Sequence, residues 1–225
     1  MKRKQLTVFL LLGAILLVAS TGCKKTSTTE SEPEPTPKPT DTSHVVVYKP
    51  NIYLYPQIKS VVSVKLEFPY GGTIIASIPD YLGEWRIEAE PTGKIENQYD
   101  YLFYESDTPD LYQYNSGWIV SRDSLFTFFK NNLSVTGFKE SEISDFTMYW
   151  VPRLTNHKFY IIYPQYTDDI NKVIKLKISP LPDNTIRLFY VIKGTETNGI
   201  NLATPIIPNY KRDGFVVAEW GVVQK

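Results

Sequence analysis

The chain has 225 residues, of which 42% are hydrophobic and 21% are charged, and its 24 basic residues balance 24 acidic ones. This is the composition of a globular protein, and the zero net charge argues against nucleic acid as a partner. One cysteine excludes a disulfide scaffold, and two histidines leave few ligands for zinc. We predict no metal and no cofactor; calcium, which needs only oxygen ligands, stays open as the alternative through loop aspartates at positions 107, 110, 168 and 169, which lack an EF-hand spacing.

Residues 1–22 have the pattern of a bacterial lipoprotein signal peptide. Basic residues at positions 2–4 precede an apolar run over positions 6–20, which is too short to span a bilayer comfortably as a helix. The small residues directly before Cys23 resemble a lipobox, although Ser20 stands where leucine is usual. The resemblance implies that Cys23 is acylated, which makes the lipid bilayer a partner of the chain.

Residues 23–43 are predicted to be the acylated cysteine and a disordered tether. Thirteen of the twenty residues after Cys23 are Thr, Ser or Pro, and four alternating prolines favour extended polyproline II. We therefore expect a lipid-anchored protein of the bacterial cell envelope, outside the cytoplasm. An aspartate directly after the acylated cysteine would resemble an inner-membrane retention signal. Position 24 holds Lys instead, which favours the outer membrane in a host with two membranes.

Residues 44–225 are predicted to form one β-rich globular body of the α+β class, with mainly antiparallel strands. Alternating apolar and polar residues predict strands over 62–68, 85–89 and 174–179. The nearly continuous apolar run over 215–223 predicts a central strand that is buried on both faces. Further strands are expected over residues 45–55, 99–105, 118–120, 147–151, 159–163 and 186–192.

One amphipathic helix is predicted over about residues 121–136. Five large apolar residues fall on one side at helical spacing: Leu125, Phe126, Phe128, Phe129 and Leu133. Ser121 is the expected N-cap and Gly137 the expected C-terminal stop. A short second helix is expected over residues 139–144, before the chain becomes extended at Phe146.

Most enzyme templates are missing from the sequence. It contains no nucleophile elbow, P-loop, His-Glu-x-x-His or glycine-rich dinucleotide turn. A pair of carboxylates is the route that stays open, since a glycosidase needs two of them, one with a raised pKa. Glu105 and Glu219 are weak candidates because each stands beside aromatic residues. The alternative is that each carboxylate pairs with an arginine or caps a turn.

Tyrosines with polar neighbours suit recognition, because Tyr brings a large contact area at low entropic cost. Tyr48, Tyr53 and Tyr55 form one group, and a second group contains Tyr99, Tyr101, Tyr104, Tyr112 and Tyr114. The loop over residues 107–115 presents Tyr112 and Tyr114 beside Asp110, and we take these three as binding candidates for sugar or peptide. The alternative is that tyrosine simply fills a β-sheet.

Four ordered segments resemble a family of uncharacterised secreted or membrane-anchored bacterial proteins. The segments are KPNIYLYP at 49–56, DFTMYWVP at 145–152, PDNTIR at 182–187 and GFVVAEWG at 214–221. The resemblance implies no activity, so it assigns no catalytic role. Asp145, Arg187 and Glu219 are charged residues among large apolar ones, which suggests a buried ion-pair network.

Three functions follow from these patterns, in order of preference. The first is a non-catalytic, membrane-anchored binding module for a glycan or an envelope protein. The second is a carboxylate-dependent glycoside hydrolase, which requires two unpaired carboxylates that converge in a cleft. The third is an envelope-structural protein, which requires no cleft.

Overall fold

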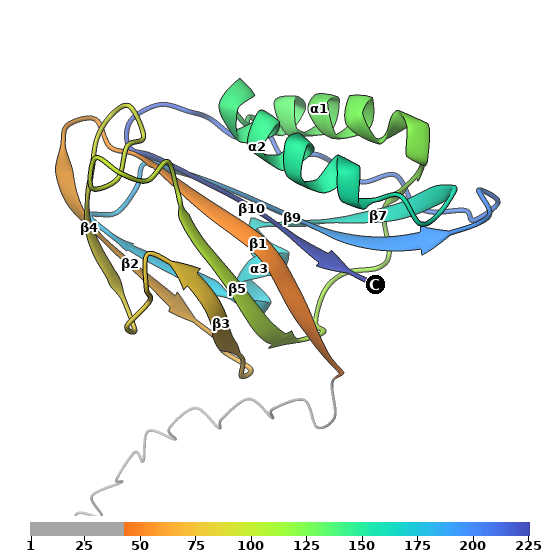
Figure 1. Cartoon of the computed structure of the whole chain (residues 1–225), viewed down its shortest axis with the longest axis horizontal. Helices are drawn as coiled ribbons and strands as arrows, with labels where there is room; N and C mark the ends of the chain where they lie inside the picture. Colours follow the sequence, from red (N-terminus) through yellow and green to blue (C-terminus); the bar gives the residue numbers. More distant parts are fainter. Residues whose placement is uncertain (1–42) are drawn as a thin grey trace, which may run out of the picture. The chain divides into compact units, whose positions relative to one another are not determined.

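The computed structural model describes residues 43–225 (Figure 1). The predicted signal peptide, Cys23 and nearly all of the predicted tether lie outside the described residues, so they remain predictions. The described helices include none that is long and apolar enough to cross a membrane.

The described chain contains ten strands and three α-helices. The strands are β1 (His44–Tyr55), β2 (Ser60–Glu67), β3 (Thr73–Ile78), β4 (Trp85–Ala89), β5 (Leu102–Pro109), β6 (Trp118–Ser121), β7 (Phe159–Tyr166), β8 (Lys175–Ser179), β9 (Asn184–Thr195) and β10 (Val216–Gln224). The helices are α1 (Leu125–Thr136), α2 (Glu140–Trp150) and α3 (Thr167–Val173), with short 3-10 turns η1 (Arg122–Ser124) and η2 (Val151–Arg153).

The strands form two sheets. Seven strands lie in the order β3-β5-β1-β10-β9-β7-β6, and three lie in the order β4-β2-β8. Strands β9 and β10 run parallel, whereas every other pair in the two described sheets is antiparallel. The predicted α+β class with a mainly antiparallel sheet is therefore confirmed.

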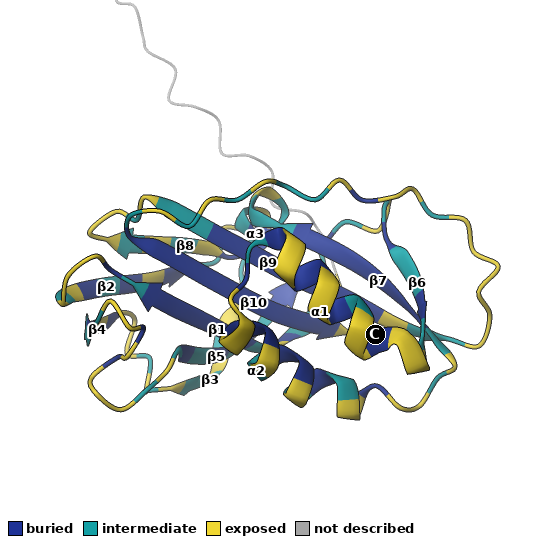
Figure 2. Ribbon diagram, turned by 90° about the horizontal axis from the view of Figure 1, so that it is seen from above, coloured by how far each residue is buried: buried dark blue, intermediate teal, exposed yellow. Residues whose placement is uncertain are grey.

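The seven-stranded sheet is the middle layer of the body. Helices α1 and α2 cover one face, and the small sheet and α3 lie on the other (Figures 1 and 2). Successive side chains of β1 point to opposite faces, so Ile52 and Leu54 join the core beside the small sheet and Tyr53 joins the core beneath the helices. Each face of the large sheet thus buries its own hydrophobic core.

The predicted central strand is confirmed, because β10 lies in the middle of the large sheet and all its residues from Val216 to Val223 are buried (Figure 2). Val217 enters the core beside the small sheet, and Trp220 enters the core beneath the helices. A strand that is buried on both faces has no polar face, which explains its continuous apolar sequence.

The first helix is confirmed with two differences. Its first turn is η1, and the hydroxyl of Ser121 donates to the hydroxyl of Ser124 at 2.8 Å instead of capping the backbone. Gly137 ends α1 in the left-handed conformation at φ 106°, as expected. Phe126 was placed on the apolar face, but its side chain is 52% exposed, because the buried face of α1 follows Leu125, Phe129 and Leu133.

The strand predicted over residues 147–151 is wrong, because α2 continues to Trp150. The buried residues Ile143, Phe146, Thr147 and Trp150 repeat at helical spacing, so a single buried stripe continues through the expected break. The second helix is consequently longer than predicted.

Two elements were not predicted, and one strand lies later than expected. The edge strand β3 and the seven-residue helix α3 are short and carry few buried side chains, so their periodic signal is weak. Strand β5 begins at Leu102 instead of residue 99, which leaves Tyr99 and Tyr101 in the loop that precedes it.

Candidate functional site

The three binding candidates lie in and beside the loop that follows β5, but they do not form one surface. Tyr112 is only 6% exposed and belongs to the core between the sheets. The hydroxyl of Tyr114 donates to both carboxylate oxygens of Asp110, at 2.7 and 2.9 Å. The ammonium group of Lys225 pairs with Asp110 at 2.5 Å. Tyr114 and Asp110 therefore satisfy each other's polar groups, and Tyr112 is a core residue.

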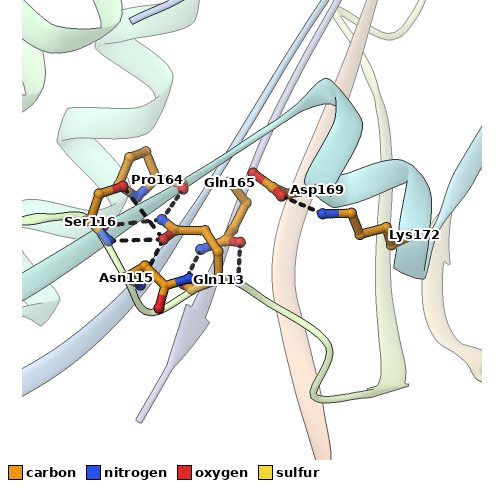
Figure 3. A network of polar contacts seen from close by, with 7 residues as sticks. All are labelled: Gln113, Asn115, Ser116, Pro164, Gln165, Asp169 and Lys172. Carbon is orange, nitrogen blue, oxygen red and sulfur yellow. Dashed lines mark hydrogen bonds and ion pairs between the residues drawn. The ribbon is translucent and has the colours of Figure 1, made fainter. Parts of the chain in front are cut away.

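The same loop is fixed to the sheet by two glutamines (Figure 3). The backbone N–H of Gln113 donates to Oε1 of Gln165 at 2.7 Å, and Nε2 of Gln165 donates to the carbonyl of Gln113 at 2.9 Å. Nε2 of Gln113 donates to the carbonyl of Pro164 at 2.6 Å. Gln165, a buried residue of β7, and the loop around Gln113 thus exchange several hydrogen bonds, which fix the loop to the sheet.

The two candidate carboxylates lie on opposite faces of the large sheet. Glu219 of β10 shares a face with Ile52, its partner in register, and this face packs on the small sheet. Glu105 of β5 is half-buried and alternates with Tyr104, which points into that same core, so Glu105 points to the helix side. The pair does not converge in a cleft, as a glycosidase would require.

Glu219 instead belongs to a buried ion pair. Its Oε2 accepts from Nε of Arg187 at 2.5 Å, and its Oε1 accepts from the hydroxyl of Tyr104 at 2.7 Å. Arg187 also donates through Nη1 to Oδ1 of Asn171 at 2.7 Å and to the carbonyl of Ile174 at 2.8 Å. The expected pairing of Arg187 with Glu219 is thus found, and it joins the segments at 182–187 and 214–221.

A second contact joins those two segments. The backbone N–H of Phe215 donates to a carboxylate oxygen of Asp183 at 2.6 Å, and the N–H of Asp183 donates to the carbonyl of Phe215 at 2.9 Å. The parallel pair β9–β10 is therefore held at its start by the two hydrogen bonds between Asp183 and Phe215, and further along by the buried ion pair of Arg187 with Glu219. Both interactions hold the centre of the sheet together.

Asp145 is separate from that network, because α2 places it on the helix side of the sheet. Its Oδ2 accepts from the hydroxyl of Tyr53 at 2.9 Å. The segments at 49–56 and 145–152 therefore meet here, and their meeting point is next to a pocket.

The pocket has a volume of about 460 Å³, and four of its eight lining residues are aromatic. Lys49 and Tyr149 line it from β1 and α2, and Phe103 lines it from β5. The loop before β5 and the end of β3 complete the lining with Gln98, Tyr99, Asp100, Tyr101 and Ile78. A volume of this size lies within the range of about 300–1,000 Å³ that is usual for small-molecule sites.

Lys49 is at the centre of this aromatic group. Its ammonium nitrogen lies 4.6 Å from the ring centroid of Tyr101, 4.9 Å from that of Phe103 and 5.4 Å from that of Tyr149. It also donates to Oδ1 of Asn51 and to the hydroxyl of Tyr101, both at 3.2 Å. A cation over three rings is held electrostatically by the negative ring faces.

A bulge in β1 puts Lys49 in this position. The register of β1 with β10 shifts between Tyr48 and Asn51, and Lys49 has a φ of 55°. Pro50 follows, and proline cannot donate a ladder hydrogen bond, so the break in pairing occurs where its cost is smallest. At this bulge the Lys49 ammonium group lies over the rings of Phe103 in β5, Tyr101 in the loop before it and Tyr149 in α2.

The loop before β5 is strained in the same way. Glu96 and Asn97 have φ values of 52° and 53° at the centre of a turn in which Gln98 N–H donates to the carbonyl of Ile95 at 3.0 Å. The buried Ile95 anchors this turn and thereby positions Tyr99. Within residues 43–225, the non-glycine residues with positive φ are Lys49, which lines the pocket, and Glu96 and Asn97, which directly precede the lining residue Gln98.

Burial shapes the electrostatics around the pocket. Desolvation lowers the pKa of Lys49 from its ordinary value, although the charges of Asp145 and Glu105 oppose the shift. Desolvation raises the pKa of Asp145, against the hydrogen bond from Tyr53 and the charge of Lys49. Desolvation also raises the pKa of the Tyr101 hydroxyl above its ordinary value. Burial therefore disfavours the charged forms of Lys49, Asp145 and Tyr101.

A larger hollow of about 730 Å³ lies between α1 and the segment around Ile207. Its polar lining consists of hydroxyl and amide side chains with one carboxylate, Asp123, and Phe128 is its one aromatic residue. We prefer the Lys49 pocket as the candidate site, because it combines several rings, a cation and strained backbone.

Sequence reasoning found part of this pocket. Tyr99 and Tyr101 belong to the predicted second tyrosine group, but Tyr149 was assigned to a strand and Lys49 was not singled out. The available signal was the Lys49-Pro50 pair inside a predicted strand, because proline in a strand interior indicates a bulge.

No group of three histidine, cysteine or carboxylate residues that could hold a metal occurs within residues 43–225. Comparison with protein-family models, with curated proteins and with solved structures gave no significant match, so the family resemblance of the four segments stays a prediction.

Proposed function

We propose that residues 44–225 are a saccharide-binding module that acylated Cys23 anchors on the outer side of a bacterial membrane. The Lys49 pocket is the proposed site. The observation that carries the proposal is the gathering of the Tyr101, Phe103 and Tyr149 rings around one ammonium group in a pocket of about 460 Å³.

This lining matches the two kinds of surface that a sugar ring has. The faces of a sugar ring present C–H groups, which pack on aromatic side chains, and its edge presents hydroxyls, which need donors and acceptors. Tyr99 and Tyr149 offer rings with hydroxyls, and Gln98 and Asp100 offer polar groups at the rim.

The strained backbone around the pocket supports the same proposal. A residue in the left-handed region costs of order 1–3 kcal/mol, and such residues gather at ligand sites when the surrounding structure holds them there. None of the side chains of Lys49, Glu96 and Asn97 is buried, so the positive φ of these residues is not needed to place their own side chains in a core.

The predicted tether suits a module that reaches for its ligand. Twenty residues of extended chain at about 3.1 Å each reach on the order of 60 Å from the membrane. The tether enters the body at the first residues of β1, five residues before Lys49. A tether of this length would let the body reach material of the cell envelope or the surrounding medium.

The alternatives are weaker on specific observations. A hydrolase that uses Glu105 and Glu219 lacks converging carboxylates, because the two lie on opposite faces of the sheet and Glu219 is paired with Arg187. An envelope-structural protein needs no aromatic pocket and no strained residues beside it.

Thermal unfolding of the full chain in mild detergent tests the proposal. The panel contains neutral and acidic saccharides, peptidoglycan fragments and unrelated peptides. A ligand at one hundred times its Kd adds about 2.7 kcal/mol, which raises Tm by about 5–11 °C for a domain of this size.

Two alanine variants locate the site. Tyr149→Ala removes a wall of the pocket and should abolish the ligand shift, which is measured from the variant's own ligand-free Tm, because the Tyr149 ring packs against the core and its loss lowers that Tm. Tyr114→Ala is the matched control, since Tyr114 is also partly exposed but lies outside the pocket. A saccharide shift that survives Tyr149→Ala, or a panel in which only peptides raise Tm, would refute the proposed function.

A further inference from the structure

The charge balance inside the pocket indicates more than a general affinity for sugar. Among the described residues, no carboxylate forms an ion pair with Lys49, which is half-buried. Burial of a charge without a counter-charge is unfavourable, and it becomes favourable when an anion binds with good hydrogen-bond geometry.

The hydrogen bonds of Lys49 leave room for such an anion. An ammonium group has three donors, and two of them go to neutral acceptors, Asn51 and Tyr101, at 3.2 Å each. The remaining donor has no acceptor in residues 43–225, and Lys49 is part of the pocket lining.

The surrounding charges are engaged elsewhere or act from a distance. Asp100, at the rim, pairs with Lys94 at 2.7 Å. Asp145 of α2 is hydrogen-bonded to Tyr53, and Arg153 of η2 stacks on the ring of Tyr149 with its guanidinium carbon 3.8 Å from the centroid. Glu105 of β5 and Asp145 act on Lys49 through space as negative charges, and Arg153 acts as a positive one.

We propose that the ligand of this pocket is an acidic saccharide, whose carboxylate pairs with the ammonium group of Lys49 while its ring packs on Tyr101 and Tyr149. This inference rests on the proposed saccharide-binding function and names the chemical class of its ligand. A uronic acid has both features, an apolar ring face and a carboxylate fixed to the ring.

Titration calorimetry on the full chain in detergent tests this with three matched probes: D-glucuronate, its neutral amide D-glucuronamide, and D-glucose. The acid should bind about 10-fold to 100-fold more tightly than the amide, because a hydrogen bond to a charged group contributes that much. Its affinity should fall as the pH rises and Lys49 loses its proton, whereas the affinity of the amide should not change.

Lys49→Met keeps the length of the side chain and removes the charge. We expect it to bind acid and amide alike, and Lys193→Met, at an exposed position outside the pocket, should keep the full preference. Near-UV circular dichroism checks that each variant is folded. If Lys49→Met does not fold, the comparison of acid with amide and the pH dependence on the unmodified chain still decide the question.

The outcomes separate the two proposals. Equal binding of acid and amide by the unmodified chain would overturn the acidic ligand and leave the saccharide-binding function standing. Preference for the acid that survives Lys49→Met would also overturn it, because another group would then hold the carboxylate. If neither the three calorimetry probes nor any acidic or neutral saccharide of the thermal-unfolding panel binds, both proposals are overturned.

Discussion

Replacing Glu219 by glutamine removes the charge that balances Arg187 and keeps the size of the side chain. In the folded chain Glu219 is 0% exposed and Arg187 is 1% exposed, and their side chains are joined at 2.5 Å. The variant leaves the arginine charge buried without a partner, which costs about 3–5 kcal/mol. For a domain of this size the loss lowers Tm by about 6–20 °C.

Thermal unfolding followed by near-UV circular dichroism measures this effect. Glu105→Gln is the control, because Glu105 is half-buried and has no ion-pair partner among the described residues, so its Tm should stay within about 2 °C of the parent. The double variant Arg187→Met/Glu219→Leu removes both charges and should unfold at a higher temperature than either single variant. If Glu219→Gln matches the parent in Tm, the reasoning about this ion pair is wrong.

Three further results are expected. Cys23→Ser should move the chain from the detergent phase to the aqueous phase on Triton X-114 partitioning, and an aqueous parent chain would contradict acylation. Burial raises the pKa of Asp145, so ionisation of this carboxyl destabilises the fold as the pH rises through the raised pKa. Asp145→Asn should therefore raise Tm at pH 7 but not at pH 3. Equal shifts of Tm at the two pH values would contradict this. Burial also raises the pKa of Tyr104 and Tyr190 well above the ordinary value, so their absorbance change at 295 nm in alkali should coincide with unfolding rather than precede it.

Much of the fold could be predicted because burial leaves a readable pattern in the sequence, an alternation where one face of a strand is buried and a continuous apolar run where both are. The alternation over residues 62–68 and the apolar run over 215–223 led directly to β2 and to the central strand β10. The predicted strand at 147–151 was wrong because large aromatic residues such as Trp150 are also typical of strands. The helical spacing of the buried residues becomes clear only when Ile143 and Phe146 are counted together with Trp150.

The candidate site was harder to predict, since it depends on contacts between distant segments. Lys49 meets Tyr101 across 52 residues, and Asp145 meets Tyr53 across 92. Local patterns cannot show such pairings. The tyrosine-rich loop at 107–115 looked like a binding surface, but whether a tyrosine such as Tyr112 points inward depends on the packing of the two sheets.

The position of β10 has a consequence for the order in which the body is made. This strand is the last to leave the ribosome among those described, yet it lies between β1, the first, and β9. Without residues 216–224 the large sheet consists of two separate halves, β3-β5-β1 and β9-β7-β6, each with an uncovered apolar edge. The large sheet can therefore close only when residues 216–224 are available to pair with both β1 and β9, which makes its completion depend on contacts that are distant in the sequence.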